Sequence, residues 1–389
     1  MGERIVFIEG ERIGAIDGRI RYFQSEYLER YRQNIRQIRE RNAWKNEGAG
    51  AAFRGEGGSH QEAATEEDPA AAIRGVDILS DGRAVYTVGS ADFSGIYLKP
   101  LADNLPESHV LHHGKLAFGA VSASPDGNEV AVTVHSEGPE CHIALVSLTG
   151  SSTRTLTEGD SVDDNPSWSR TSRRIYYNSA GIGRDMAGGY RGVGPSAICC
   201  LDLDRKVVED VYAQAGHDCL LPREAPDGSI YFLRRPHSNT NGHGMSFLDI
   251  LMLPYKILKG LFHFLEFFTH RYTGETFNTR GANPARSRNP DSRQLFIQGN
   301  LINVEKALKE NQSRGETYPG IAPASWQLMR LTPAGQAEVV KKGVLDYDVA
   351  PNGDVVYSNG KFLVRLAKDG REERLEKVDL AVKVRVRNT

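Results

Sequence analysis

Three pairs of adjacent polar side chains in this chain belong to types that bind metals or transfer protons. They are His112–His113, Asp163–Asp164 and His217–Asp218. Imidazole and carboxylate groups are common ligands of catalytic metals, but such a site needs three or more of them to converge, each oriented by a further hydrogen bond. The sequence does not show convergence. It leaves open the hypothesis of a metal-dependent lyase or hydrolase with its site in a central funnel.

Motifs of established catalytic centres are absent from the chain. There is no GxSxG nucleophile elbow, which excludes a close analogue of the α/β-hydrolase peptidases and esterases. The HExxH zinc motif and the calcium-loop signature are absent too. The GxG spacings in residues 180–195 do not open a helix after a parallel strand, so they argue against a dinucleotide site. We therefore predict no catalytic residue, no resident metal and no cofactor.

The composition is that of a globular protein with many tight turns. The chain has 389 residues, of which 39% are hydrophobic, 25% are charged and 40 are glycine. A formal net charge of -2 gives no overall field that favours nucleic acid or an anionic membrane. The four cysteines show no CxxC spacing and are interpreted as reduced core thiols. The start, MGERIVFIEG, does not read as an export signal, so we expect a cytoplasmic location.

A turn signature recurs six times, and each copy precedes a short run of alternating apolar residues. It consists of a small residue followed by Pro-Asp-Gly or a variant, and the copies begin at Leu79, Ser124, Ser169, Ala225, Asn289 and Ala350. Pro fixes φ, Asp bonds its own backbone and Gly accepts positive φ, so each copy reverses the chain between antiparallel strands. Successive copies are 45, 45, 56, 64 and 61 residues apart. A four-stranded blade has a period of about 40–45 residues, so the spacing predicts an all-β propeller over residues 1–389 with helical insertions.

Two of these repeats resemble the blades of TolB-like propellers. They are DDNPSWSRTSRRIYYNS at 163–179 and SASPDGNEVAVTV at 122–134, and the resemblance extends over roughly residues 73–377. It implies a WD-repeat-like propeller and, in the wider family, a platform for protein interaction. Because the chain shows no export signal and carries large insertions, the resemblance implies a cytoplasmic bacterial relative rather than TolB's own periplasmic role.

The two ends of the chain supply strands that the six signatures do not account for. Segments 5–8, 12–16 and 19–23 read as three strands, and 380–386 reads as a fourth. An open propeller would expose strand edges, so we predict that the last strand joins the first three in a composite blade. This gives seven four-stranded antiparallel blades, with six as the alternative. Lys383, Arg385 and Arg387 alternate with valines, a pattern more typical of an edge strand.

Residues 24–44 form a predicted helix between the first strands and the first signature. Leu28, Tyr31, Ile35 and Ile38 lie on one seam, which we expect to pack on the propeller. Five arginines lie elsewhere around the helix, and we interpret them as a solvated surface rather than a nucleic-acid site. Residues 46–69, rich in Gly, Ala and Glu, read as a flexible linker.

Residues 245–268 form the most apolar segment, which reads as a short helix followed by a longer one that begins near Pro254. Charged residues interrupt it too often for a transmembrane span. Its apolar surface must be covered by the propeller, by a partner or by a membrane interface, and a peripheral membrane contact is left open. The candidate docking residues of this insert are Phe247, Leu251, Leu258, Leu261, Phe262, Leu265 and Phe268.

A second insertion, residues 180–195, is expected to lie beside the loop at 160–165 on one rim of the propeller. The candidate partner-binding rim consists of Asp160, Asp163, Asp164, Arg184, Asp185, Tyr190, Arg191, His217 and Asp218. Their mixture of Arg, Asp and Tyr suits protein contact, although these loops could also only cap the ring. The sequence thus favours a non-catalytic scaffold that binds protein partners of unknown identity, as a monomer or within a hetero-complex.

Overall fold

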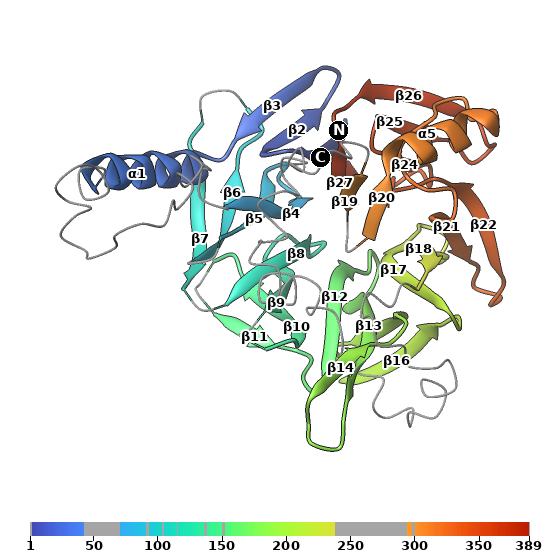
Figure 1. Cartoon of the computed structure of the whole chain (residues 1–389), viewed down its shortest axis with the longest axis horizontal. Helices are drawn as coiled ribbons and strands as arrows, with labels where there is room; N and C mark the ends of the chain where they lie inside the picture. The colour runs from blue at the N-terminus through green and yellow to red at the C-terminus, as the bar shows by residue number, and fades with distance from the viewer. Residues whose placement is uncertain are drawn as a thin grey trace, which may run out of the picture.

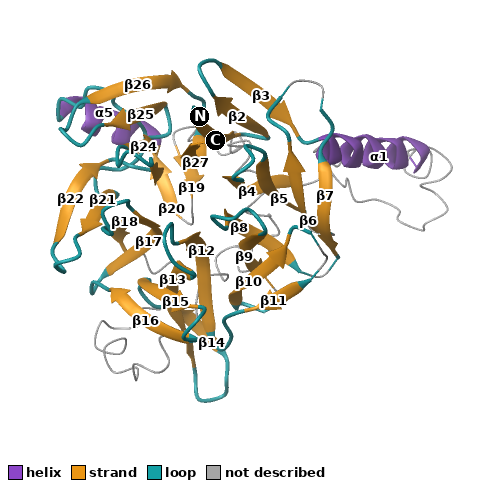
Figure 2. Cartoon of the chain, turned by 180° about the vertical axis from the view of Figure 1, so that it is seen from behind, coloured by secondary structure: helices purple, strands orange, loops and turns teal. Residues whose placement is uncertain are grey.

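The computed structural model describes residues 2–42, 71–90, 93–102, 105–114, 116–135, 138–149, 152–237, 294–297 and 300–388. The predicted linker at 46–69 and the predicted apolar insert at 245–268, including its docking residues, lie outside the described residues. Antiparallel four-stranded units surround a common axis, and the two described helices lie outside the ring of strands (Figures 1 and 2).

The described residues form six such units, each of which runs from an inner strand at the axis to an outer strand at the rim. The first contains β27 (Ala381–Asn388), β1 (Glu3–Glu9), β2 (Arg12–Ile16) and β3 (Ile20–Gln24). The second contains β4 (Ala72–Ile78), β5 (Ala84–Gly89), β6 (Ser94–Lys99) and β7 (Ser108–His113). The third contains β8 (Ala117–Ala123), β9 (Glu129–His135), β10 (Cys141–Ser147) and β11 (Thr153–Thr155).

The remaining units complete the ring. The fourth contains β12 (Ser161–Trp168), β13 (Arg174–Arg184), β15 (Ala197–Asp202) and β16 (Val207–Tyr212). The fifth contains β17 (His217–Glu224), β18 (Ile230–Pro236), β21 (Gln327–Leu331) and β22 (Ala337–Lys342). The sixth contains β23 (Asp346–Val349), β24 (Val355–Ser358), β25 (Phe362–Leu366) and β26 (Glu372–Lys377). The innermost strands contact one another in a closed cycle, β27, β4, β8, β12, β17, β23 and β27 again. The architecture is therefore a β-propeller.

The predicted composite blade is confirmed, and the described residues contain six four-stranded units, the number predicted as the alternative to seven. β27 pairs with β1 in antiparallel register, with Val386 opposite Ile5. The signature at Asn289 lies outside the described residues, and the two strands after it, β19 (Gln294–Ile297) and β20 (Asn300–Asn303), pair only with each other among the described strands. They lie in the connection from β18 to β21, which pair directly.

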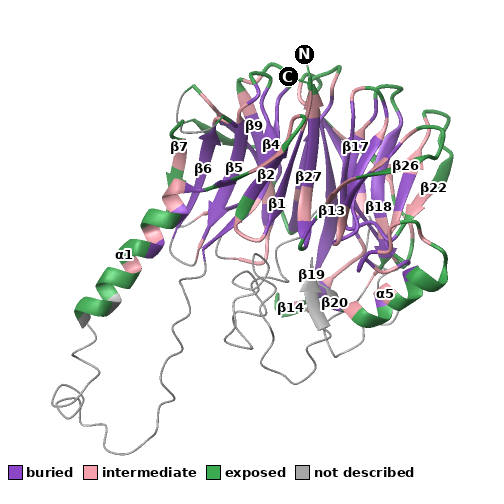
Figure 3. Cartoon of the chain, turned by 90° about the horizontal axis from the view of Figure 1, so that it is seen from above, coloured by how far each residue is buried: buried purple, intermediate pink, exposed green. Residues whose placement is uncertain are grey.

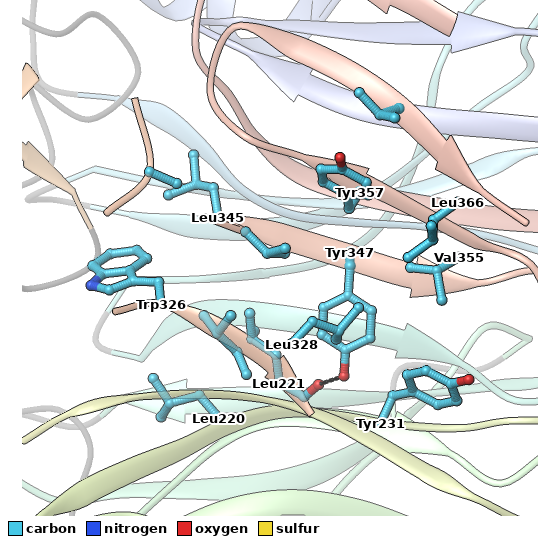
Figure 4. Packing of buried hydrophobic residues seen from close by; sticks show 14 of the residues in the cluster. Leu220, Leu221, Tyr231, Trp326, Leu328, Leu345, Tyr347, Val355, Tyr357 and Leu366 are labelled. Carbon is cyan, nitrogen blue, oxygen red and sulfur yellow. Dashed lines mark hydrogen bonds between the residues drawn. The ribbon is translucent and has the colours of Figure 1, made fainter. Parts of the chain in front are cut away.

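The core lies between neighbouring blades, where strand residues are buried while the ends of the blades are exposed (Figure 3). Figure 4 shows one such interface, in which Tyr347 of the sixth blade lies beside Leu221 and Leu328 of the fifth. The Tyr347 hydroxyl donates to the Leu221 carbonyl at 2.7 Å, so the buried phenol has its hydrogen bond. The four cysteines are buried and form no disulfide, as the core-thiol interpretation requires, and burial raises the pKa of Cys200 to about 11.

The helix α1 (Glu26–Asn42) matches the predicted helix but packs on the ring only through its first half. Leu28 is buried and Tyr31 is half-buried against Phe93, whereas Ile38 on the same seam is 52% exposed. Its first turn is fixed by a reciprocal cap with Glu107, whose carboxylate accepts from the amides of Glu26 at 3.0 Å and of Tyr27 at 2.6 Å. In the described part of the chain, no helix is long and apolar enough to cross a membrane.

Candidate binding face

The larger described insertions gather at one end of the propeller, which we call the insertion face. It carries α1, the β19–β20 hairpin, the helix α5 (Val304–Ser313) and the strand β14 (Tyr190–Val193) (Figure 3). Both chain ends lie at the opposite end of the ring. This division follows from the topology: the innermost strands run in one direction, so the Asp-Gly turns after them lie at one end and the connections from second to third strands lie at the other.

β14 extends β13 into a hairpin that projects beyond the ring (Figures 1 and 2). Its turn is held by Asp185, whose carboxylate accepts from the amides of Ala187 at 3.0 Å and Gly189 at 2.7 Å. Gly188 has φ of 81°, a left-handed conformation that favours glycine. Met186 at the tip is fully exposed, which distinguishes it from the other large apolar side chains of the described residues. A rigid turn therefore presents an apolar side chain to solvent.

The base of the hairpin is joined to the entry of β12, as the sequence predicted for the two loops. Arg184 donates to Asp160 at 2.7 Å and to Glu140 at 2.5 Å, and its hydrogen bond to Asp160 raises the pKa of the guanidinium. The backbone amide of Ile182 donates to the Asp160 carbonyl at 3.2 Å. At the tip, Arg191 forms an ion pair with Asp185 at 3.2 Å. Tyr190, the first residue of β14, packs against the buried cluster that contains Ile182. Five predicted rim residues thus belong to one hairpin and its support.

Asp163 and Asp164 lie deeper in β12 than a rim residue would. Asp163 is buried and accepts from the hydroxyls of Ser161 at 3.0 Å and Ser179 at 2.7 Å. Asp164 accepts from Thr133 at 2.6 Å and from the backbone amide of its neighbour. Both carboxylates are used to join strands, so the structure does not place them at a partner surface.

His217 and Asp218 are adjacent in sequence but differ in environment. His217 is half-buried, and its Nδ1 contacts the Ala215 carbonyl at 3.1 Å. Asp218 is buried 2.7 Å from Nδ1 of His237 and 3.4 Å from Arg235. Burial acts to raise the pKa of Asp218, but the hydrogen bond with His237 and the charge of Arg235 outweigh it, so the pKa is lowered. Asp218 therefore remains an anion in a buried ion cluster.

The fold does not assemble the three polar pairs into one site. His112 lies on β7 beside the rings of Phe93 and Tyr27, whereas the Asp and His–Asp pairs lie on β12 and β17. Within the described ranges, no group of three or more His, Cys, Asp or Glu side chains is placed to hold a metal ion.

Sequence reasoning missed a charged cluster at the axis of the ring. Lys383 and Arg385 on β27 meet Asp346 of β23 at 3.7 and 3.0 Å. Arg223 on β17 meets Asp348 at 3.6 Å. The signal was the alternation of basic residues with valines in β27, which by itself is typical of an edge strand. β27 is in fact the inner edge of its blade, and its basic side chains contribute to the axis.

Comparisons with known proteins identify the fold. No family model matches the chain, and no curated protein matches it. The solved structure of TolB from Acinetobacter baumannii is similar, with a TM-score of 0.52, 12% sequence identity, and coverage of 100% of this chain and 67% of that one. A nidogen/laminin complex chain is similar with a TM-score of 0.50, 8% identity, and coverage of 99% and 98%.

The ring and its face define the chain as a β-propeller that carries its larger described insertions at one end. More particularly, its fold is that of the TolB-like propellers, and the resemblance stated from the blade sequences is confirmed at the level of the fold.

Proposed function

We propose that this protein is a non-catalytic β-propeller that binds a protein partner through its insertion face. The observation that carries the proposal is the β13–β14 hairpin, whose turn is fixed by hydrogen bonds to Asp185 and leaves the Met186 side chain fully exposed. An apolar side chain already fixed in place loses little conformational entropy on binding, which is the property of an anchor residue. Methionine also adapts its shape to an apolar pocket.

The charged residues of the hairpin support the same role. Arg184 is fixed by Asp160 and Glu140, and Arg191 is paired with Asp185, so polar groups surround the exposed methionine. An apolar anchor inside a polar rim is the usual arrangement of a protein interface. The insert at 245–268, which the sequence predicts to be apolar, adds a second docking element in this proposal.

The alternative of a metal-dependent lyase or hydrolase receives less support. Its candidate residues lie on different blades, and Asp163 and Asp164 have their oxygens occupied by neighbouring strands. The buried polar group around Asp218, with His237 and Arg235, is an ion cluster that contains a single carboxylate.

A site-specific photocrosslinker tests the proposal. Placed at position 186 of the intact chain in cells, it should yield one dominant crosslinked protein, and the variant Met186→Asp should weaken binding of the recovered partner by about 30-fold or more, the effect of losing a hot spot of about 2 kcal/mol. The matched control is the same crosslinker at Val339, an exposed apolar residue on the outer strand β22. If positions 186 and 339 give the same products, the hairpin is not the docking element.

A further inference from the structure

Three cations lie near one another at the axis of the propeller, buried among the innermost strands. Arg385 and Arg223 are almost fully buried, and 15% of the Lys383 side chain is exposed. Two carboxylates, Asp346 and Asp348, are the anions within ion-pair distance of them in the described residues. Three positive charges therefore share two negative ones.

The two carboxylates are also the acceptors for backbone amides. Asp346 accepts from the amide of Val384 at 2.9 Å, and Asp348 accepts from the amide of Val386 at 2.8 Å. These amides lie on the inner edge of β27, where no described strand is paired to accept from them. Asp348 accepts in addition from the amide of Val349 at 2.9 Å. The two carboxylates thus serve three backbone amides as well as the cations, which have the Asn165 side-chain oxygen and the carbonyls of Val384 and Pro222 as further acceptors.

Two guanidinium groups of the cluster keep unsatisfied donors. Arg385 Nε and Arg223 Nη2 are buried without an acceptor among the described residues. One carboxylate oxygen, Asp346 Oδ2, accepts no hydrogen bond there either, but it lies 3.7 Å from the Lys383 ammonium and pairs with it as a charge. An unpaired buried donor is costly, so the cluster would be stabilised by a further acceptor.

Two further carboxylates act on the cluster from a distance. Asp164 acts electrostatically on Lys383, and Asp77 acts on Arg385. The oxygens of both carboxylates receive other donors from β4, β8, β9 and β12. They therefore moderate the positive charge without supplying the missing hydrogen bonds.

Lys383 is the cation of this cluster that solvent reaches. Its ammonium donates to the Asn165 side-chain oxygen at 3.2 Å and lies 3.7 Å from Asp346. Burial lowers the pKa of Lys383, the charge of Asp346 opposes this, and the charges of Arg385 and then Arg223 lower the pKa further. The ammonium is therefore held near like charges with few acceptors of its own.

We propose that the axis of the propeller binds a small oxyanion, of the phosphate or carboxylate class, at Lys383 and in the field of Arg385 and Arg223. Such an anion supplies the acceptor oxygens that the buried guanidinium groups lack. The proposed anion site lies at the axis and not on the β13–β14 hairpin, so its test does not depend on the proposed docking function.

The test is the reactivity of the Lys383 amine in the full chain. Trace acetylation followed by mass spectrometry is measured in inorganic phosphate, in acetate and in chloride at equal ionic strength. We expect millimolar phosphate or acetate to slow the labelling of Lys383 at least 10-fold, while chloride has no such effect. Lys206, in an exposed turn, is the internal control and should label equally in all three. Phosphate and acetate used separately show which oxyanion is preferred.

A second measurement separates a built site from weak association. Phosphate should raise the midpoint of thermal unfolding of the natural chain but not of Lys383→Met, while Lys206→Met keeps the full response. If Lys383→Met does not fold, the labelling of the natural chain decides alone. Equal protection of Lys383 in chloride and phosphate, or protection that also appears at Lys206, would mean an adventitious ion only and would overturn the proposal.

Discussion

Removing the carboxylate of Glu107 should release the first turn of α1 from the second blade. That carboxylate accepts from the amides of Glu26 and Tyr27 and from the Tyr86 hydroxyl, and Glu26 in return accepts from the Glu107 amide at 3.1 Å. The cap therefore joins residues 80 or more positions apart in the sequence. The ion pairs of Lys99 with Glu26 and of Arg32 with Glu11 also join α1 to the ring, but neither reaches the two amides of the first turn.

The expected magnitude follows from the two amide bonds. A hydrogen bond to a charged group contributes about 1.5–3 kcal/mol, and loss of a helix N-cap costs about 0.5–2 kcal/mol, so Glu107→Ala should cost about 2–3 kcal/mol for local opening of α1. At about 1.36 kcal/mol per factor of ten, the amides of the first turns should exchange about 30- to 160-fold faster. Glu107→Gln keeps one acceptor oxygen and should lose about 1 kcal/mol, or about 5-fold.

Hydrogen exchange measured by mass spectrometry on peptides from α1 is the assay. The strands of the fourth blade should keep their exchange rates in both variants, because the cap lies on the second blade. Glu158→Gln, which changes an exposed glutamate, is the matched control. If α1 in Glu107→Ala exchanges as it does in the natural chain, packing of Tyr27 and Tyr31 anchors the helix and the role assigned to the cap is wrong.

Lowering the pH should also loosen α1, because the hydrogen bond with Lys99 lowers the pKa of Glu26 below its usual 4.5. The stability that ionised Glu26 contributes is complete above pH 4.5 and is lost as the pH falls through the lowered pKa of the folded state. Exchange of α1 that keeps a constant protection factor from about pH 6 to about pH 3 would contradict this. Arg170→Ala removes hydrogen bonds to carbonyls on two neighbouring blades and should lower the free energy of unfolding by about 2–4 kcal/mol. Urea titrations measure this loss, and an unchanged midpoint would argue that Arg170 does not link the blades. Asp346→Ala leaves Arg385 without its anion and should cost about 3–5 kcal/mol, measured in the same way, with a loss below about 1 kcal/mol counting against the axial cluster.

The fold was largely predictable because its information is local and repeated. Pro-Asp-Gly turns and alternating apolar residues specify hairpins wherever they occur, and five of the six signatures open a four-stranded blade. The remaining one, at Asn289, lies outside the described residues, and the two strands after it form a separate hairpin. Whether a hairpin joins a blade depends on pairing with strands far away in the chain, and in this chain β18 pairs with β21 across that insertion.

The candidate face was predictable only in part. Proximity of Asp160 and Arg184 followed from the connection rule of a propeller, and the structure brings them together. The sequence did not indicate that Asp163 is buried, because successive side chains of a strand such as β12 point to opposite faces of the sheet. The axial cluster joins Arg223 to residues near 346 and 383, and a separation of more than 100 residues leaves no local pattern to detect.

The pairing of β27 with β1 also sets the order of events during synthesis. β1 is the first described strand in chain order, whereas its partner β27 is the last. One edge of β1, the strand that carries Val6 and Ile8, therefore stays unpaired until the other described blades have been translated. A nascent chain that stalls before β27 carries that open edge into the crowded cell, where strand edges recruit other chains. The ring is thus completed only once β27 has been synthesised, and the interval before it is when the protein is most vulnerable to aggregation.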